Sequence, residues 1–330
     1  MNGTALSPES AARLVEAAAA APSLHNTQPW RFVVSLAGQV VEIHADPSRG
    51  LAHADPLGRA VYIACGAALL NLRLAAACWG AEPVVRLLPS PADPLWLATV
   101  RLAGHRQLRC GERDLHAAIG RRHTSRRPFT GPPLPRPVRA ELAEAAALEG
   151  ASLRFLDGGE VQHVLELTAA ADRELRADRG YLRELAAWTG RVRRYDGVPA
   201  RAMAPKAAGA LPPVRNLRAG RWYRPEPVEF EENPQLAILS TRSADRTAWL
   251  RAGQALQRVL LVATHRGVAA SPLTQALEVP DAPLASDGRG LGEHPQMILR
   301  FGYAHAGPPT PRRPICDVMR IVGDGAAAQA

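Results

Sequence analysis

Two segments of this chain, each bounded by glycines, follow the same pattern, and this repeat restricts the possible folds more than any other feature. Residues 66–80 align without gaps on residues 253–267, a shift of 187 positions. Apolar residues recur in both at the i, i+3, i+4 and i+7 spacing of a helix with a buried face. The closing residues, Gly80 and Gly267, suit a left-handed C-terminal cap. The pattern predicts two equivalent buried helices.

Weaker similarities extend the repeat on both sides of these helices. Residues 13–18 resemble residues 141–146, and a strand is predicted after each of these segments and again after each buried helix. The predicted strands are 30–34 and 95–102 in the first half, and 152–156 and 296–301 in the second. Alanine-rich helices can also resemble one another through composition alone, so the repeat is an interpretation with that alternative.

The second half is longer than the first between its first strand and its buried helix, by 64 residues. The extra sequence is dense in Arg and Pro and carries Trp222, Tyr223 and Phe230 near its end. We expect an ordered segment at about 172–240 that acts as a lid over a site. The alternative is a disordered surface insertion.

A loop that joins the first predicted helix to the first predicted strand has the composition of a ligand site. Residues 21–30 read Ala-Pro-Ser-Leu-His-Asn-Thr-Gln-Pro-Trp. Pro22 ends the helix, and short donors and acceptors follow between two rigid elements. The matching region of the second half is five residues shorter, so this loop occurs once. An Asn/Ser turn without a ligand is the alternative.

An arginine-rich segment, residues 121–127, begins the second half. It reads Arg-Arg-His-Thr-Ser-Arg-Arg, and guanidinium groups with hydroxyls match phosphate oxygens. A solvated basic linker is the alternative. The chain has 40 Lys+Arg against 31 Asp+Glu, a formal charge of +9, but the arginines are dispersed and no nucleic-acid-binding motif accompanies them. A phosphorylated ligand is therefore favoured over nucleic acid.

Two further segments could contact a ligand. Residues 267–275 form an apolar turn whose free backbone N–H groups could press against a flat aromatic ring, and Arg312 and Arg313 add guanidinium groups near the C-terminus. The four cysteines lie far apart, and the ten histidines show no metal-ligand spacing. No uninterrupted apolar segment approaches about 18 residues, so we expect neither membrane insertion nor secretion, and a cytoplasmic location.

Together these four segments resemble the FMN-dependent nitroreductase superfamily, and within it the Acg-type branch, in which two nitroreductase-like halves are fused. The resemblance covers nearly the whole chain. It implies an α+β fold, an α/β/α sandwich in which each half has a mixed, mainly antiparallel sheet flanked by helices. The implied halves are residues 1–117 and 118–330. The fusion implies a monomer that is an internal pseudo-dimer, or a homodimer of such chains.

The resemblance also implies one FMN per chain, because the first half keeps the loop and the second keeps the arginine-rich segment. The phosphate or ribityl end should contact Arg122 and Thr124, with Arg312 and Arg313 completing the phosphate cluster, and Arg126 should approach the pyrimidine edge. The remaining implied contacts are Pro22 and Ser23 at the flavin, Asn26 at the ring edge or ribityl chain, Gln28 bracing the loop, and Pro272, Leu273 and Thr274 facing the ring.

The activity implied is hydride transfer from NAD(P)H through FMN to a nitroaromatic or quinone-like acceptor, with no protein nucleophile. Two departures favour an alternative. Gln275 stands where many relatives have glycine, and the insertion could cover the flavin. The alternative function is an FMN-sequestering, storage or stress-related flavoprotein with little reductase activity.

Overall fold

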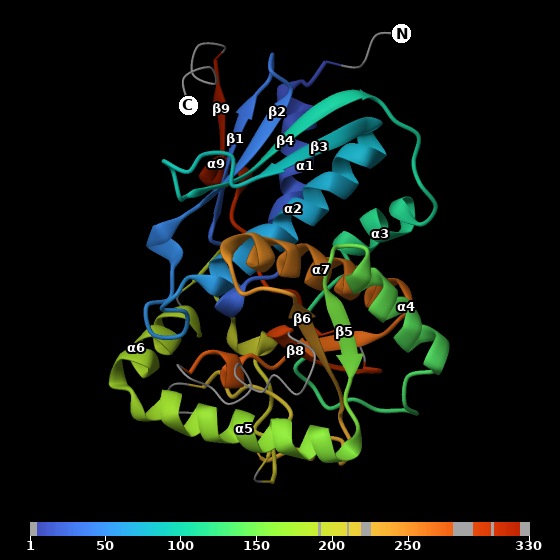
Figure 1. Ribbon diagram of the computed structural model, residues 1–330. Helices are drawn as coiled ribbons and strands as arrows, with labels where there is room; N and C mark the ends of the chain where they lie inside the picture. The colour runs from blue at the N-terminus through green and yellow to red at the C-terminus, as the bar shows by residue number, and fades with distance from the viewer. Residues whose placement is uncertain are drawn as a thin grey trace.

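Two long helices cross at the centre of the molecule and separate two sheets (Figure 1). The computed structural model describes residues 5–190, 193–209, 211–218, 226–279, 293–304 and 307–323. Helix α2 spans Arg59–Trp79 and helix α7 spans Arg246–His265. Both are helical where the repeat predicts, and both are mostly buried. Gly80 has φ +93° and Gly267 has φ +70°, the left-handed conformation expected after each helix.

The crossing of α2 and α7 depends on one glycine from each helix. A Cβ atom at Gly66 would lie 2.2 Å from the carbonyl oxygen of Leu250, and one at Gly253 would lie 2.0 Å from the carbonyl oxygen of Ile63. The two contacts are related by the same shift of 187 positions as the sequence pattern. The first residue of each aligned segment is therefore the point where the backbones touch, and a side chain there has no room.

The first sheet contains five strands in the order β3-β4-β2-β1-β9. Its strands are β1 (Trp30–Ser35), β2 (Val40–Ala45), β3 (Ala81–Leu87), β4 (Trp96–His105) and β9 (Met319–Val322). The first four pair antiparallel, whereas β9 pairs parallel to β1, with Phe32 opposite Met319. The C-terminal strand therefore joins the sheet built by the N-terminal part of the chain.

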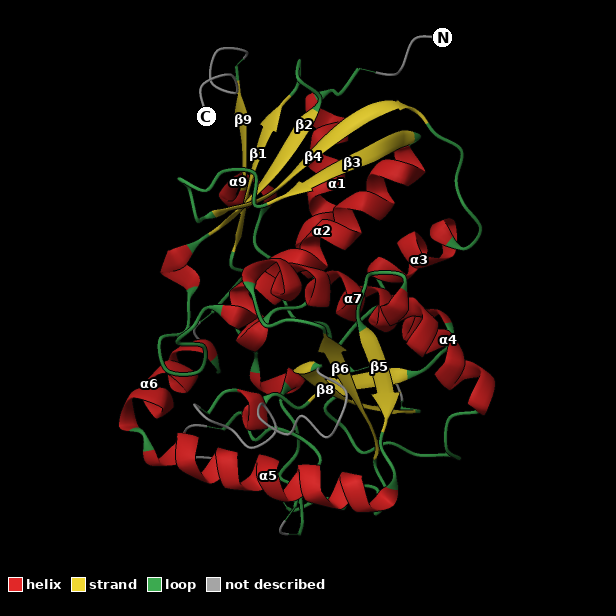
Figure 2. Cartoon of the chain, viewed as in Figure 1, coloured by secondary structure: helices red, strands yellow, loops and turns green. Residues whose placement is uncertain are grey.

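The second sheet has four antiparallel strands in the order β5-β6-β8-β7. They are β5 (Ser152–Phe155), β6 (Gln235–Thr241), β7 (Ala269–Pro272) and β8 (His294–Gly302). In chain order this repeats the arrangement β1-β2-β4-β3 of the first sheet. With helices and mainly antiparallel sheets, the chain has the α+β fold expected (Figure 2).

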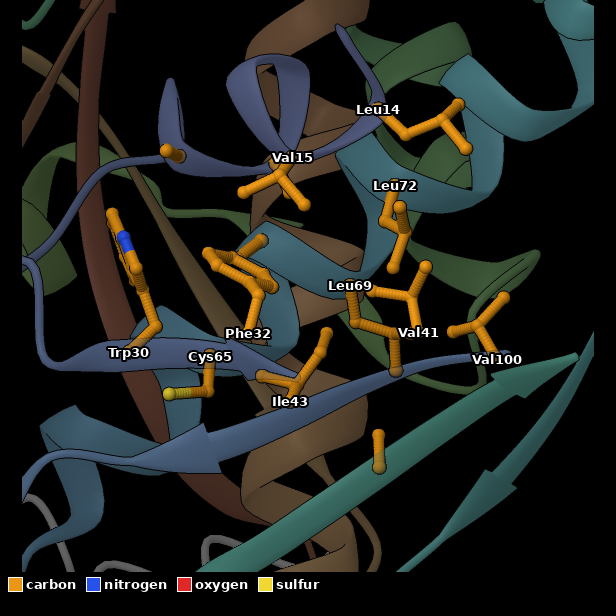
Figure 3. Close-up of a cluster of buried hydrophobic side chains, with 14 of the residues drawn as sticks. Leu14, Val15, Trp30, Phe32, Val41, Ile43, Cys65, Leu69, Leu72 and Val100 are labelled. Atoms are coloured by element: carbon orange, nitrogen blue, oxygen red, sulfur yellow. The ribbon is translucent and has the colours of Figure 1, made fainter. Parts of the chain in front are cut away.

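Four shorter helices pack against the central helices or the first sheet. They are α1 (Pro8–Ala19), α3 (Glu112–Ile119), α4 (Arg136–Ala147) and α9 (Ile315–Val318). Helix α1 packs on α2, and α4 packs on α7. Figure 3 shows the apolar core between the first sheet, α1 and α2, where Val15 of α1, Phe32 of β1 and Leu69 of α2 converge. Their burial fixes β1 and α2, the elements that flank the ligand loop.

The segment between β5 and β6 has no counterpart between β1 and β2, which are joined by four residues. It contains α5 (Gly158–Ala177), α6 (Arg179–Trp188) and a long irregular stretch. It thus begins earlier than the predicted 172 and ends where β6 starts at Gln235. Two side chains of α6, Leu185 and Trp188, form a separate apolar cluster with Leu51 of the first half. The predicted aromatic residues Trp222 and Tyr223 lie outside the described residues.

Five strands were not predicted, namely β2, β3, β6, β7 and β9. β3 begins directly after Gly80, and its residues alternate between half-buried and exposed positions, which gives little apolar signal. β7 lies inside the stretch predicted as an apolar turn, and only the residues after Pro272 turn away.

One helix among the described residues, α2, is long and apolar enough to cross a membrane. Of its most apolar 18-residue window, 83% is buried inside the protein, so this helix serves as the core of the fold.

Candidate functional site

A cavity of about 410 Å³ opens between the N-terminal end of α2, the α7 helix, the turn after β7 and the insertion. Apolar side chains from both central helices line it, among them Ile63, Leu256 and Leu260. Its polar lining comes from Ser23, His25, Asp55, Arg59, Thr124, Arg126, Arg215, Ser271, Thr274 and Glu278. A largely apolar cavity of this size with a few polar groups suits a small organic ligand.

The predicted ligand loop wraps one side of this cavity in a strained conformation. His25, Asn26 and Gln28 have φ of +51°, +57° and +52°, which non-glycine residues rarely adopt. The backbone N–H of Gln28 donates to the Ser23 hydroxyl at 2.9 Å. Both Pro22 and Ser23 line the cavity. The turn forced by these residues holds the loop against the cavity wall.

The side chain of Asn26 ties the loop to two distant segments. Its amide nitrogen donates to the carbonyl oxygens of Gly197, at 2.9 Å, and Pro311, at 3.0 Å. Its amide oxygen accepts from Arg312 at 3.0 Å. Gln28 also ties the loop to the insertion, because its side-chain amide donates to the Tyr195 carbonyl at 2.9 Å. The contact of Asn26 with the flavin stays a prediction, and in this structure the Asn26 amide makes contacts within the protein.

Replacing Asn26 by alanine should loosen the insertion, since three hydrogen bonds that join it and the C-terminal segment to the loop disappear. We expect destabilisation by about 2 kcal/mol and faster proteolysis near Gly197. Limited proteolysis followed by mass spectrometry of the fragments measures this. Asn233→Ala removes an exposed asparagine of the same insertion and is the control. Equal cleavage rates for both variants would contradict the bracing role.

The arginine-rich segment is held beside β7. The backbone N–H of Ser125 donates to the Ala270 carbonyl at 3.0 Å, and Thr124 forms a bridge with the same residue. This pairing directs Thr124 and Arg126 into the cavity. The guanidinium of Arg126 donates to the Ala202 carbonyl of the insertion at 3.1 Å. Burial, and then the nearby Arg215, lower the pKa of Arg126 to about 10.

Behind the loop, two more guanidinium groups converge on one backbone oxygen. Arg122 and Arg312 both donate to the Ala20 carbonyl, at 3.4 and 3.1 Å. Burial lowers the pKa of Arg312 to about 10, and burial together with Arg312 and Arg126 lowers the pKa of Arg122 to about 9. The Nε atoms of both side chains are buried and unpartnered among the described residues. Buried cations without a carboxylate favour an anionic ligand.

Arg215 and Glu278 form a buried ion pair in the cavity wall, and neither residue was predicted to belong to the site. Arg215 belongs to the insertion, and its guanidinium also donates to the Thr274 hydroxyl at 3.1 Å. Sixty-three residues separate the pair, and no motif surrounds either member. His25 lines the same cavity as this ion pair. Burial first, then Arg215 and Arg126, hold the pKa of His25 well below its usual value.

Asp55 and Arg59 form the polar wall at the N-terminal end of α2, and they too were not predicted. The Asp55 carboxylate accepts from the backbone N–H groups of Ala60 and Val61, at 3.0 and 3.2 Å, and so caps the helix. Burial raises the pKa of Asp55 to about 6. Arg59 donates to the Gln296 carbonyl at 2.5 Å.

The predicted site residues therefore fall into four groups. The cavity is lined by Pro22, Ser23, Thr124, Arg126, Pro272 and Thr274. Arg122 and Arg312 lie behind the loop, while Asn26 and Gln28 brace it. Leu273 and Arg313 lie elsewhere. Leu273 is fully buried in an apolar cluster, and Arg313 donates to the Asp317 carbonyl at 2.8 Å and lies 4.0 Å from Asp46.

Comparison with known proteins gives relatives over nearly the whole chain. The chain is 36% identical over 308 residues to "Putative NAD(P)H nitroreductase Rv3131" of Mycobacterium tuberculosis H37Rv, covering 91% of this chain and 88% of the relative. It is 31% identical over 320 residues to the same organism's "Putative NAD(P)H nitroreductase acg", covering 93% and 94%. No protein-family model matches the chain.

Solved structures give a weaker likeness. A nitroreductase with bound FMN from Bacteroides fragilis is 16% identical with a TM-score of 0.37, covering 66% of this chain and 98% of that one. The FMN-dependent nitroreductase NfnB of Mycobacterium smegmatis, in complex with NADPH, is 18% identical with a TM-score of 0.39, covering 64% and 98%.

The full-length relatives decide the class: the chain belongs to the nitroreductase family, in the Acg-type branch. The resemblance carried by the loop and the arginine-rich segment is thereby confirmed.

Proposed function

We propose that this protein binds one FMN in the 410 Å³ cavity and uses it as an NAD(P)H-dependent oxidoreductase for nitroaromatic or quinone-like acceptors. The observation that carries the proposal is the buried arginine cluster. Arg126 lines the cavity, and Arg122 and Arg312 lie buried behind the ligand loop, where both Arg312 and Arg126 act on Arg122 electrostatically. None of the three has an acidic partner among the described residues. A phosphate group would neutralise them and satisfy the unpartnered Nε atoms.

The rest of the cavity also fits a flavin. Its apolar walls from α2 and α7 suit the flat ring system, and Arg122 and Arg312 lie behind the loop that supplies Pro22 and Ser23 to the lining. Bound FMN would supply the hydride chemistry. Arg126 places a cation at the wall, Thr124 and Ser23 offer hydroxyl donors, and the neutral His25 imidazole avoids adding charge. Pro272 and the apolar side chains of α2 and α7 that line the cavity would exclude water from the ring.

A second function, FMN sequestration with little turnover, is favoured by one observation. Val214, Arg215 and Leu217 of the insertion line the same cavity as the central helices. A nicotinamide ring has to stack on the flavin to deliver hydride, and a seated insertion competes for that face.

Purified protein should bind FMN and turn yellow, and anaerobic NADPH or NADH then separates the two functions. Prompt bleaching of the flavin absorbance supports the oxidoreductase. Persistent colour that only dithionite removes supports sequestration. A preparation that stays colourless after addition of FMN would contradict both.

The organisation of the chain supports a single site. We propose that the two sheets of equal strand order represent an internal duplication, with halves 1–117 and 118–330, and that only one composite flavin site survives. The crossed helices then supply an internal dimer interface, so a monomer is favoured. Four cysteines without a disulfide are consistent with the cytoplasm.

A further inference from the structure

Arg215 is the only guanidinium that the insertion contributes to the cavity lining within the described part of the chain. Arg215 is 7% exposed, and the Nη1 atom of its guanidinium has no hydrogen-bond partner among the described residues. Nη2 is held by the Thr274 hydroxyl and the Glu278 carboxylate. The group is therefore fixed in orientation, with one edge left free for a ligand.

The charges around Arg215 leave this wall of the cavity positive. Arg126 is close enough for Arg215 to lower its pKa, and burial, then Arg215 and Arg126, hold the pKa of the cavity-lining His25 well below its usual value. Glu278 pairs directly with Arg215, and Tyr181 and Asp172 also act on Arg215 electrostatically. On the neighbouring wall, Asp55 and Glu278 both act on Arg59. Among the described residues that line the cavity, three arginines thus stand against two carboxyl groups, Asp55 and Glu278.

We propose that Arg215 and Glu278 set the reduction potential of FMN in this cavity, with Arg215 raising it and Glu278 lowering it. The inference rests on the proposed FMN site. Reduction by two electrons and one proton leaves a negative charge on the flavin, which a buried cation stabilises. Arg215 and Glu278 both line the cavity, so a ring bound there would share its low-dielectric interior with these two charges.

Arg215 belongs to the insertion and not to the central helices or the sheets. Because the insertion carries this cation, the flavin is most easily reduced while the insertion is seated against Thr274 and Glu278. Loss of that contact would remove the cation and leave the Glu278 charge beside the ring.

The test is an equilibrium redox titration of FMN-loaded full-length protein against a dye of known potential. Arg215→Gln should shift the equilibrium toward oxidised FMN by about tenfold or more, which is about 30 mV for a two-electron couple. Glu278→Gln should shift it in the opposite direction. Arg215→Lys keeps the charge and should lie nearer the wild type, and Arg201→Gln removes an exposed arginine of the insertion as the control.

The outcomes separate this inference from the proposed function. If the wild type binds no FMN, the proposed function fails. If it binds FMN, and Arg215→Gln and Glu278→Gln leave the potential unchanged or move it in the same direction, the electrostatic role is overturned while FMN binding stands. Should Arg215→Gln fail to fold, the sign of the Glu278→Gln shift decides.

Discussion

Replacing Gly253 by alanine is expected to destabilise the protein by about 3 kcal/mol or more, enough to prevent accumulation of folded chains in the cell. The added methyl group would lie 2.0 Å from the Ile63 carbonyl oxygen and 2.9 Å from the Ala67 nitrogen, both of them backbone atoms of α2. Backbone cannot rotate away as a side chain can. The two central helices would have to separate, which disturbs the cavity between them.

The matching substitution Gly66→Ala should have a similar effect, because its Cβ would meet the Leu250 carbonyl oxygen at 2.2 Å. Gly120→Ala is the control: nothing lies within 4 Å of its added Cβ, and its φ of −70° suits alanine. Chemical denaturation of the three variants measures the differences. Equal midpoints for Gly253→Ala and Gly120→Ala would show that the helices do not meet at this point.

Replacing Arg122 by methionine should stabilise the ligand-free protein and weaken FMN binding at the same time. Methionine fills the volume of the stem without the charge, whose burial beside Arg312 and Arg126 is unfavourable. We expect a gain of about 1–3 kcal/mol in the free energy of unfolding of the ligand-free protein. Loss of charge-assisted hydrogen bonds to phosphate should raise the FMN Kd by about 10- to 100-fold.

Thermal unfolding with and without FMN, together with fluorescence titration, tests this opposite pair of effects. Arg313→Met is the control, since the Arg313 guanidinium lies 4.0 Å from Asp46 and donates to the Asp317 carbonyl, away from the cavity. It should lower stability slightly and leave FMN binding nearly unchanged. A loss of ligand-free stability in Arg122→Met would contradict the account of an uncompensated buried charge.

The pH dependence has a definite sign. Burial, then Arg312 and Arg126, lower the folded-state pKa of Arg122 from its usual value to about 9, so above pH 9 the unfolded chain binds more protons than the folded one. The stability of the ligand-free wild type should therefore rise relative to Arg122→Met as pH increases above 9. Denaturation midpoints at pH 8 and about pH 10 compare the two proteins.

Local patterns were sufficient for the parts of the fold that depend on a single segment. The periodicity and closing glycines of 66–80 and 253–267 predicted both central helices, and β1, β5 and β8 lie where apolar strands were expected. β3 escaped because a half-exposed strand has weak periodicity. The insertion was predicted by length, but its helices α5 and α6 and its true beginning were not.

The family, the two central helices and the segments that surround the candidate site could be predicted without the fold, because each depends on residues close together in the chain. Which side chains share the cavity depends on long-range packing. Arg215 and Glu278 meet through the packing of the insertion on the turn after β7, and the Asn26 amide reaches the carbonyls of Gly197 and Pro311 because distant segments pack on the loop. Burial and the distances between charges follow from that packing, and the buried arginine cluster that favours an anionic ligand follows from both.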